Sequence, residues 1–147
     1  IHPTSTDPKR TYCENRFLKL AKALQKKGYH PVFCVAPTER KNWEKLVKNK
    51  FDVPHFPTLK ELAIYIFESH FLIGNESGLG HLASNLKIPT LIVTSCPKQM
   101  KLWRPGFLKG RVVTPPRYIP NIKKLRIREK YWQYLISTRR IIREFIR

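Results

Sequence analysis

The chain has 147 residues, 41% of them hydrophobic, and a formal net charge of +19. This length supports one ordinary domain, and the charge indicates phosphate-bearing partners. Three scattered cysteines without a CxxC pair exclude a disulfide framework and fit a reducing, cytosolic compartment, while no apolar run reaches the roughly 18 residues that span a bilayer.

Helices and strands are predicted to alternate along the chain. Apolar residues at i, i+3, i+4 and i+7 indicate helices, and short, nearly continuous apolar runs indicate strands buried on both faces. In chain order we expect a helix over 14–27, a strand over 31–36, a helix capped by Thr38 and running to Val47, a helix over 59–67, a strand over 70–74, a helix over 79–86, strands over 89–95 and 111–116, and a terminal helix over 131–145. This alternation predicts right-handed βαβ crossovers and an α/β fold with a Rossmann-like, doubly wound parallel sheet.

A glycine-rich stretch, IGNESGLGHLA over residues 73–83, follows one predicted strand. In open parallel sheets, ligands bind beyond the carboxyl ends of the strands, where a strand turns into a helix. Gly78 and Gly80 allow the backbone to approach a ligand, and the first amides of the helix favour an anion such as phosphate. The carboxylate of Glu76 would repel a phosphate but accepts hydrogen bonds from two vicinal ribose hydroxyls. The stretch therefore predicts a nucleotide site.

Structural roles are the alternatives for the same residues. The glycines can be simple turn formers, Glu76 a helix cap, and His81 a structural histidine on the helix that follows. The chain contains neither GxGxxG nor GxxxxGK[ST], which argues against a nicotinamide enzyme or a P-loop nucleotidase. It also lacks an Asp-x-Asp pair and any His/Cys spacing typical of a metal site.

GNESGLGHLASNLKIPTLIV, over residues 74–93, resembles the signature D-[TS]-G-x-x-H-L-A-x-[AS]-L-x-x-P of glycosyltransferase family 9, the bacterial lipopolysaccharide heptosyltransferases. IHPTSTDPKR, at the start of the chain, resembles the family's H-P-G/T-[AST]…K-x-W motif, and GYHPVFCVAPTER resembles its G-x-x-V-V…G-x-x-x-E element. Glu76 stands where the family generally has aspartate. Pro37 and Thr38 replace a usual glycine, and Thr11 and Tyr12 stand where a tryptophan is common.

This resemblance implies the carboxy-terminal, donor-binding half of a two-domain GT-B glycosyltransferase. Carried over residue by residue, it implies that the hydroxyls of Thr4 and Ser5 lie near the donor phosphates and that Lys9 binds the diphosphate. Glu39 matches an acid near the nucleoside. The donor loop that the resemblance implies consists of Glu76, Ser77, Gly78 and His81.

The implied reaction is an inverting transfer of a heptose-type sugar from a nucleotide-diphosphate sugar, similar to ADP-heptose, to a lipopolysaccharide core acceptor. The resemblance implies no metal cofactor, because Lys9 and the helix end stabilise charge on the leaving diphosphate. In this family the acceptor domain and its proposed catalytic base precede the donor domain. Residues 1–147 are thus expected to form a single donor-binding domain of a longer protein, inactive in transfer by itself and without an assignable catalytic residue.

The partners expected from the resemblance are the nucleotide-sugar donor, an anionic lipopolysaccharide precursor as acceptor, and the protein's own amino-terminal domain. The expected location is the cytoplasm, in peripheral contact with the inner face of the bacterial inner membrane. Residues 98–147 carry 15 lysines and arginines against Glu129 and Glu144, a net charge of +13. This charge either meets the anionic acceptor or is simply solvated.

Two other classes of function stay open. The isoelectric point of about 10.3, with Tyr131, Trp132 and Tyr134 among basic residues, suggests a nucleic-acid-binding module, although these aromatics fall on a helical stripe that is typical of core packing. The other class is a non-catalytic or epimerase-like GT-B domain. Trp103, in the family's W-x-P pattern with Arg104 and Pro105, is expected to be a packing residue.

Overall fold

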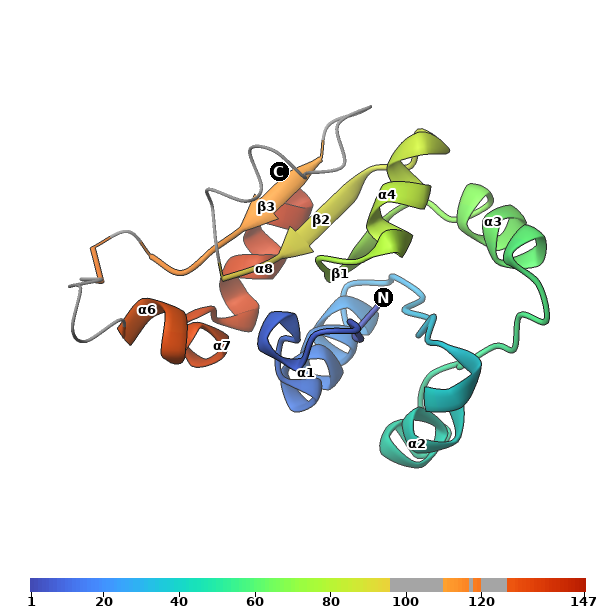
Figure 1. The fold of residues 1–147 in the computed structure, drawn as a ribbon, viewed down its shortest axis with the longest axis horizontal. Helices are drawn as coiled ribbons and strands as arrows, with labels where there is room; N and C mark the ends of the chain where they lie inside the picture. Colours follow the sequence, from blue (N-terminus) through green and yellow to red (C-terminus); the bar gives the residue numbers. More distant parts are fainter. Residues whose placement is uncertain (96–109, 117, 120–126) are drawn as a thin grey trace.

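The computed structural model describes residues 1–95, 110–116, 118–119 and 127–147 (Figure 1). At its centre lies a parallel sheet of three strands, in the order β1 (Leu72–Asn75), β2 (Thr90–Val93) and β3 (Arg111–Val113). In this register Leu72 lies opposite Thr90, and Leu91 lies opposite Arg111. β2 and β3 lie within runs that the sequence predicts to be strands, and β1 overlaps the predicted strand over 70–74 and extends one residue beyond it, to Asn75.

Single bridges extend the parallel pairing beyond β1. His2 pairs with Gly74, where the His2 amide donates to the Ile73 carbonyl at 2.8 Å and the His2 carbonyl accepts from the Asn75 amide at 3.1 Å. The Cys34 amide donates to the carbonyl of Ile1, and Val32 pairs with Asp52. Across the sheet the order is residue 52, residues 32–34, residues 1–2, β1, β2 and β3. This is the 3-2-1-4-5-6 order of Rossmann folds, and it reverses between residues 1–2 and β1.

Helices surround this sheet, and α2 and α3 lie at the opposite end of the molecule from α6 and α7 (Figure 1). A single 3₁₀ turn, η1, precedes the first helix. The bounds are η1 Pro8–Arg10, α1 Glu14–Gln25, α2 Pro37–Val47, α3 Leu59–Phe67, α4 Gly78–Asn85, α6 Ile127–Lys130, α7 Trp132–Leu135 and α8 Thr138–Ile146.

Two apolar clusters occupy the two faces of the sheet. Ile73, Leu91 and Val93 pack in one cluster with buried residues of α1, α2 and α8. Leu72 and Cys34 pack in the other with buried residues of α3 and α4. Neighbouring strand residues point to opposite faces, so the two clusters place helices on both sides of the sheet. The Rossmann-like, doubly wound parallel fold that the sequence predicts is thereby confirmed.

The start of α2 differs from the prediction, and so does the run before it. Residues 31–36 make one bridge and isolated hydrogen bonds instead of a continuous strand, since their neighbours also pair over only one or two residues. Ala36, not Thr38, is the N-cap of α2, because Pro37 has the fixed φ that suits the first helical position. The carboxylate of Glu39 accepts from the Ala36 amide at 3.4 Å.

The prediction of one terminal helix over 131–145 is wrong in one respect: the segment forms two short helices, α7 and α8, and the separate short helix α6 precedes it. Ile136 is extended, with φ −100° and ψ 112°, and Ser137 caps α8 by accepting from the Arg140 amide. The carbonyl of Ile136 accepts hydrogen bonds from the Tyr12 hydroxyl and the Arg16 guanidinium, each at 2.6 Å. These two side-chain donors satisfy the Ile136 carbonyl, which has no helical hydrogen-bond partner because the helix is broken there.

Candidate functional site

Two loops meet at the carboxyl edge of the sheet, where the strand order reverses. One follows residues 1–2 and the other follows β1, and the fully buried side chain of Asn75 joins them. Its amide nitrogen donates to the Pro3 carbonyl at 2.6 Å, and its oxygen accepts from the Tyr12 amide at 2.9 Å. An asparagine side chain supplies both a donor and acceptor, so it satisfies both loops at once. Asn75 therefore sets the spacing between the loops.

The carboxylate of Glu76 lies at this edge and is 10% exposed. One oxygen is 3.4 Å from the guanidinium of Arg10, and the other accepts from the Thr94 hydroxyl at the end of β2, at 3.3 Å. The Glu76 carbonyl accepts from the Ser5 hydroxyl at 3.3 Å. Glu76 does not cap α4, because Ser77 holds the N-cap position. The acid is thus held between the two loops and the end of β2.

The amino terminus of α4 adjoins Glu76. The Ser77 hydroxyl makes no capping bond, and this buried oxygen has no hydrogen-bond partner in the described part of the chain. Gly78 opens the helix, is exposed, and would present an added Cβ to open space. His81 lies one turn further along and is partly buried. A buried hydroxyl without a partner among the described residues, beside the amino terminus of a helix, is an arrangement that an anionic ligand can complete.

A cavity of about 280 Å³ opens beside these loops, between the starts of α1 and α2. Thr4, Ser5 and Glu39, which the sequence places in separate motifs, all line it. Its wall is completed by Pro3, Thr11, Glu14, Thr38, Asn42 and Trp43. The hydroxyls and carboxylates suit part of a polar ligand, whereas Trp43 is 1% exposed and stacks on Phe33.

Lys9 lies on η1 at the rim of the site and is exposed. Its backbone is fixed on both sides, since its amide donates to the Asp7 carboxylate at 2.9 Å and its carbonyl accepts from the Trp132 indole at 3.1 Å. The Gln133 side chain donates to the Thr11 carbonyl at 2.6 Å. The carboxy-terminal segment therefore holds the loop that carries the basic residues.

The sequence-based candidates thus fall into two neighbouring groups. Thr4, Ser5 and Glu39 line the cavity, the donor-loop residues 76–78 surround the start of α4, and Ser5 connects the groups through its bond to Glu76. Sequence reasoning did not single out Asn75, Arg10 or Thr94. Each of them had a sequence signal that could have identified it. Asn75 is a polar residue at the end of an apolar strand, and Thr94 is a hydroxyl just beyond the next strand. Arg10 is a cation two residues before Tyr12, which matches the spacing of the K-x-W motif.

Two titratable groups next to the site are structural. Burial lowers the pKa of His2, and its Nδ1 lies 2.7 Å from the Cys34 carbonyl, so the neutral imidazole donates a hydrogen bond there. Burial raises the pKa of the Cys34 thiol, which keeps this thiol protonated and unreactive at neutral pH. Both residues hold the sheet together next to the topological switch point, the place between residues 1–2 and β1 where the strand order reverses.

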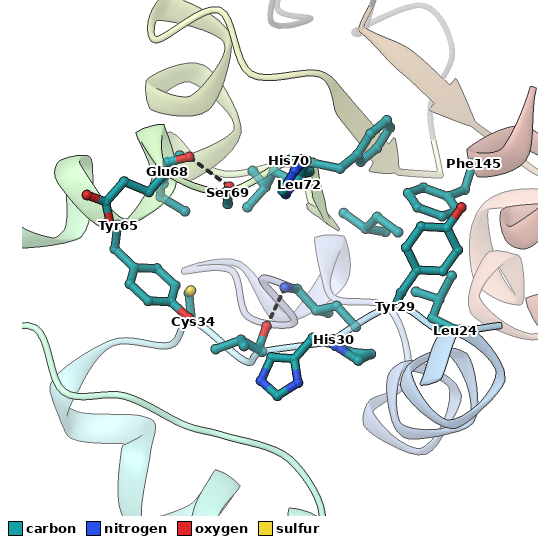
Figure 2. Close-up of a pocket in the computed structure, with 17 residues that line it drawn as sticks. Leu24, Tyr29, His30, Cys34, Tyr65, Glu68, Ser69, His70, Leu72 and Phe145 are labelled. Atoms are coloured by element: carbon teal, nitrogen blue, oxygen red, sulfur yellow. Dashed lines mark hydrogen bonds between the residues drawn. The ribbon is translucent and has the colours of Figure 1, made fainter. Parts of the chain in front are cut away.

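A larger cavity, of about 880 Å³, opens at the other edge of the sheet (Figure 2). Tyr29, Tyr65 and Phe145 line it, together with the amino ends of the strands at Val32 and Leu72. Ligands of open parallel sheets bind at the carboxyl ends, so this cavity is not the candidate site. Over the described ranges, no three His, Cys, Asp or Glu side chains gather to hold a metal ion, and none of the helices there can cross a membrane.

The strand order, the polar loops at its reversal and the open helix terminus define a Rossmann-like domain of the kind found in GT-B enzymes. The sequence profile of glycosyltransferase family 9 (heptosyltransferase) matches residues 1–113. The chain belongs to this family. No sequence among the curated proteins matches it. The W-x-P resemblance at Trp103 to Pro105 lies outside the described residues.

Solved structures share the fold. E. coli ADP-heptose lps heptosyltransferase II matches with a TM-score of 0.77 and 19% identity over 99% of this chain and 44% of its own length. E. coli heptosyltransferase WaaC with ADP matches with a TM-score of 0.68 and 18% identity over 98% of this chain and 41% of its own. A family 9 glycosyl transferase from Veillonella parvula matches with a TM-score of 0.67 and 18% identity, over 97% and 43%. The chain thus spans less than half the length of these proteins.

Proposed function

We propose that this chain is the carboxy-terminal, donor-binding domain of a family 9 glycosyltransferase and that the switch-point loops hold the nucleotide-diphosphate part of a sugar donor. The observation that carries this proposal is the buried hydroxyl of Ser77 at the amino terminus of α4, which has no hydrogen-bond partner among the described residues. A phosphate oxygen at this position would accept hydrogen bonds from the Ser77 hydroxyl and from the first backbone amides of the helix. Gly78 leaves room for that approach.

The remaining site residues bind different parts of the donor. Lys9 and Arg10 supply positive charge to the diphosphate, and the hydroxyls of Thr4 and Ser5 lie near its phosphates. The cavity that these two residues line together with Glu39 receives the nucleoside, with Glu39 near it. The ion pair with Arg10 offsets the negative charge of Glu76, so this carboxylate can lie near a phosphate and still accept from ribose hydroxyls. His81 contacts the donor from the next turn of α4.

We expect the donor to be an adenosine-diphosphate sugar of the heptose type and the acceptor to be a lipopolysaccharide core precursor. The support is the family, together with solved relatives described as WaaC with ADP and WaaC with ADP-2-deoxy-2-fluoro heptose. Transfer would invert the sugar carbon, with an acceptor and a general base supplied by an amino-terminal domain. The cations and helix amides would stabilise the leaving diphosphate without a metal ion.

Titration calorimetry with ADP, an ADP-sugar and UDP tests this proposal on the purified protein. Ser77→Ala and Glu76→Ala are expected to weaken ADP binding about tenfold or more, the effect of losing one hydrogen bond to a charged group. Glu68→Ala, an exposed acid at the end of α3, is the matched control and should leave the affinity unchanged. If the wild type and the three variants bound ADP with equal affinity, the donor site would not lie at the topological switch point.

The nucleic-acid alternative receives less support from the structure. Trp132 is 2% exposed, donates to the Lys9 carbonyl and packs with Tyr12, so it is unavailable for stacking on bases. A short DNA duplex serves as the competing ligand in the same titration. Binding of DNA that is lost in Glu76→Ala to the same degree as ADP binding would favour this alternative.

A further inference from the structure

Helices α1 and α8 lie side by side on one face of the sheet and run in the same direction. Their amino ends meet where the Tyr12 hydroxyl donates to the Ile136 carbonyl. Their carboxyl ends meet where the rings of Tyr29 and Phe145 pack edge to face, 4.9 Å apart. Both helices bury their apolar sides in the same cluster, so their outer sides face the same direction.

The outer side of α1 is basic. Its buried residues Phe17, Leu20 and Leu24 point to the sheet. Lys19, Lys22 and Lys26 follow at i, i+3 and i+7, are exposed, and therefore form a stripe opposite the buried side. The acid of this helix, Glu14, lines the cavity at the carboxyl edge and lies away from the stripe.

The outer side of α8 continues this basic surface. Ile141 is buried against the sheet, whereas Arg139, Arg143 and Arg147 are exposed at i, i+4 and i+8. Glu144 pairs with Arg147 at 3.4 Å, which offsets that one charge of the stripe. Because packed helices lie roughly 8–10 Å apart, the two stripes form one surface. We call it the α1/α8 basic face: Lys19, Lys22, Lys26, Arg139, Arg143 and Arg147.

Exposed apolar side chains border this face at one end. Tyr29 is 47% exposed just beyond α1, and Ile146 is 54% exposed at the end of α8. A planar array of cations with a tyrosine and an aliphatic side chain at its margin suits the headgroup region of a bilayer, where aromatic rings and apolar tips enter and cations meet lipid phosphates. The two stripes carry no aromatic side chain on which a base could stack.

We propose that the α1/α8 basic face docks the protein on an anionic lipid bilayer, with Tyr29 and Ile146 entering the headgroup region. This docking goes beyond donor binding and does not depend on it. Each cation near an anionic surface contributes about a factor of five to the partition coefficient, and salt weakens the attraction. The surface lies away from the candidate donor site at the carboxyl edge, so both can be occupied together.

Co-sedimentation of the purified protein with vesicles tests this docking. Phosphatidylcholine vesicles that contain phosphatidylglycerol are expected to bind the protein, and phosphatidylcholine alone is expected to bind far less. Lys22→Glu with Arg143→Glu should lower the partition coefficient at least about thirtyfold, as two lost cations predict. The matched control is Lys60→Glu with Lys87→Glu, on exposed positions of the other face, and should lower it only a few-fold at most.

Lys22→Gln with Arg143→Gln provides a milder variant, and thermal unfolding of each protein verifies that it is folded. An equal loss in both charge-reversed pairs would overturn the proposal, since net charge alone would then explain binding. Absence of binding to phosphatidylglycerol vesicles would overturn it as well. Loss of duplex-DNA binding with unchanged vesicle binding would assign the face to nucleic acid instead. ADP affinity, measured in parallel, should stay unchanged, which separates this test from that of the donor site.

Discussion

The side-chain amide of Asn75 lies 2.6 Å from the carbonyl oxygen of Pro3, 72 residues earlier in the chain. The same side chain accepts from the Tyr12 amide and is inaccessible to solvent. One buried asparagine thus holds together the two loops that carry the candidate donor residues.

Replacement of Asn75 by alanine should destabilise the protein by about 2–4 kcal/mol, because a buried amide and a buried carbonyl would each lose their partner. Urea unfolding measures this change. Asn85→Ala, at an exposed position of α4, is the control and should stay within about 0.5 kcal/mol of the wild type. A similar small change for Asn75→Ala would show that the loops are held by other contacts.

Gly74 and Gly78 should respond differently to the same substitution. A Cβ on Gly74 would lie 2.6 Å from the His2 carbonyl oxygen, so Gly74→Ala must displace the pairing between residues 1–2 and β1 and should cost about 1–3 kcal/mol. A Cβ on Gly78 meets open space, so Gly78→Ala should fold normally and weaken ADP binding by occupying the phosphate position. Thermal unfolding and calorimetry compare the two. Equal stability losses would contradict the packing at Gly74.

His2 should make stability depend on pH. Burial lowers its pKa below the ordinary value of 6.5, so the unfolded chain binds more protons than the folded one between the lowered value and 6.5. The contribution of His2 is fully present above 6.5 and is lost as the pH falls below it. Urea unfolding at about pH 7.5 and about pH 5.5 measures the loss. His2→Gln should reduce this difference, and the exposed control His55→Gln should keep it.

Arg10→Ala should weaken ADP binding more than Lys9→Ala does. Removal of the Arg10 guanidinium takes away a cation and also leaves the Glu76 carboxylate without the charge 3.4 Å away, so Glu76 would repel the diphosphate. We expect a loss of about tenfold to a hundredfold for Arg10→Ala. Calorimetry on both variants, at low and high salt, measures the difference. A larger effect of Lys9→Ala would make Lys9 the main cation of the site.

The parallel fold could be predicted from the sequence because strands buried on both faces form short apolar runs between amphipathic helices. The Pro31–Ala36 run shows the limit of this signal. Its composition is that of a strand, but a strand needs a neighbour of similar length, and Asp52 and Ile1 pair with it only briefly. The break at Ile136 was not predicted either, because the two side chains that donate to its carbonyl lie more than a hundred residues away in the chain.

In the candidate site too, local features could be predicted from the sequence and contacts between distant segments could not. The glycine-rich stretch identified the residues of one loop, since their spacing is local and resembles a family motif. Contacts between loops have no such local pattern: Arg10 reaches Glu76 across 66 residues, and Thr94 reaches the same carboxylate across 18. The contact of Arg10 with Glu76 depends on the turn at η1, and only the tertiary structure shows it.

The bonds from Trp132 and Gln133 to the loop at Lys9 and Thr11 bear on the order of folding. A ribosome releases the loop more than a hundred residues before it releases the indole that holds it, so the sheet can assemble while the loop still lacks its support. The ability to retain a nucleotide should therefore arise late in synthesis, after the apolar core has formed. Stalled chains that end before and after residue 132 would show this step as the appearance of ADP protection against proteolysis.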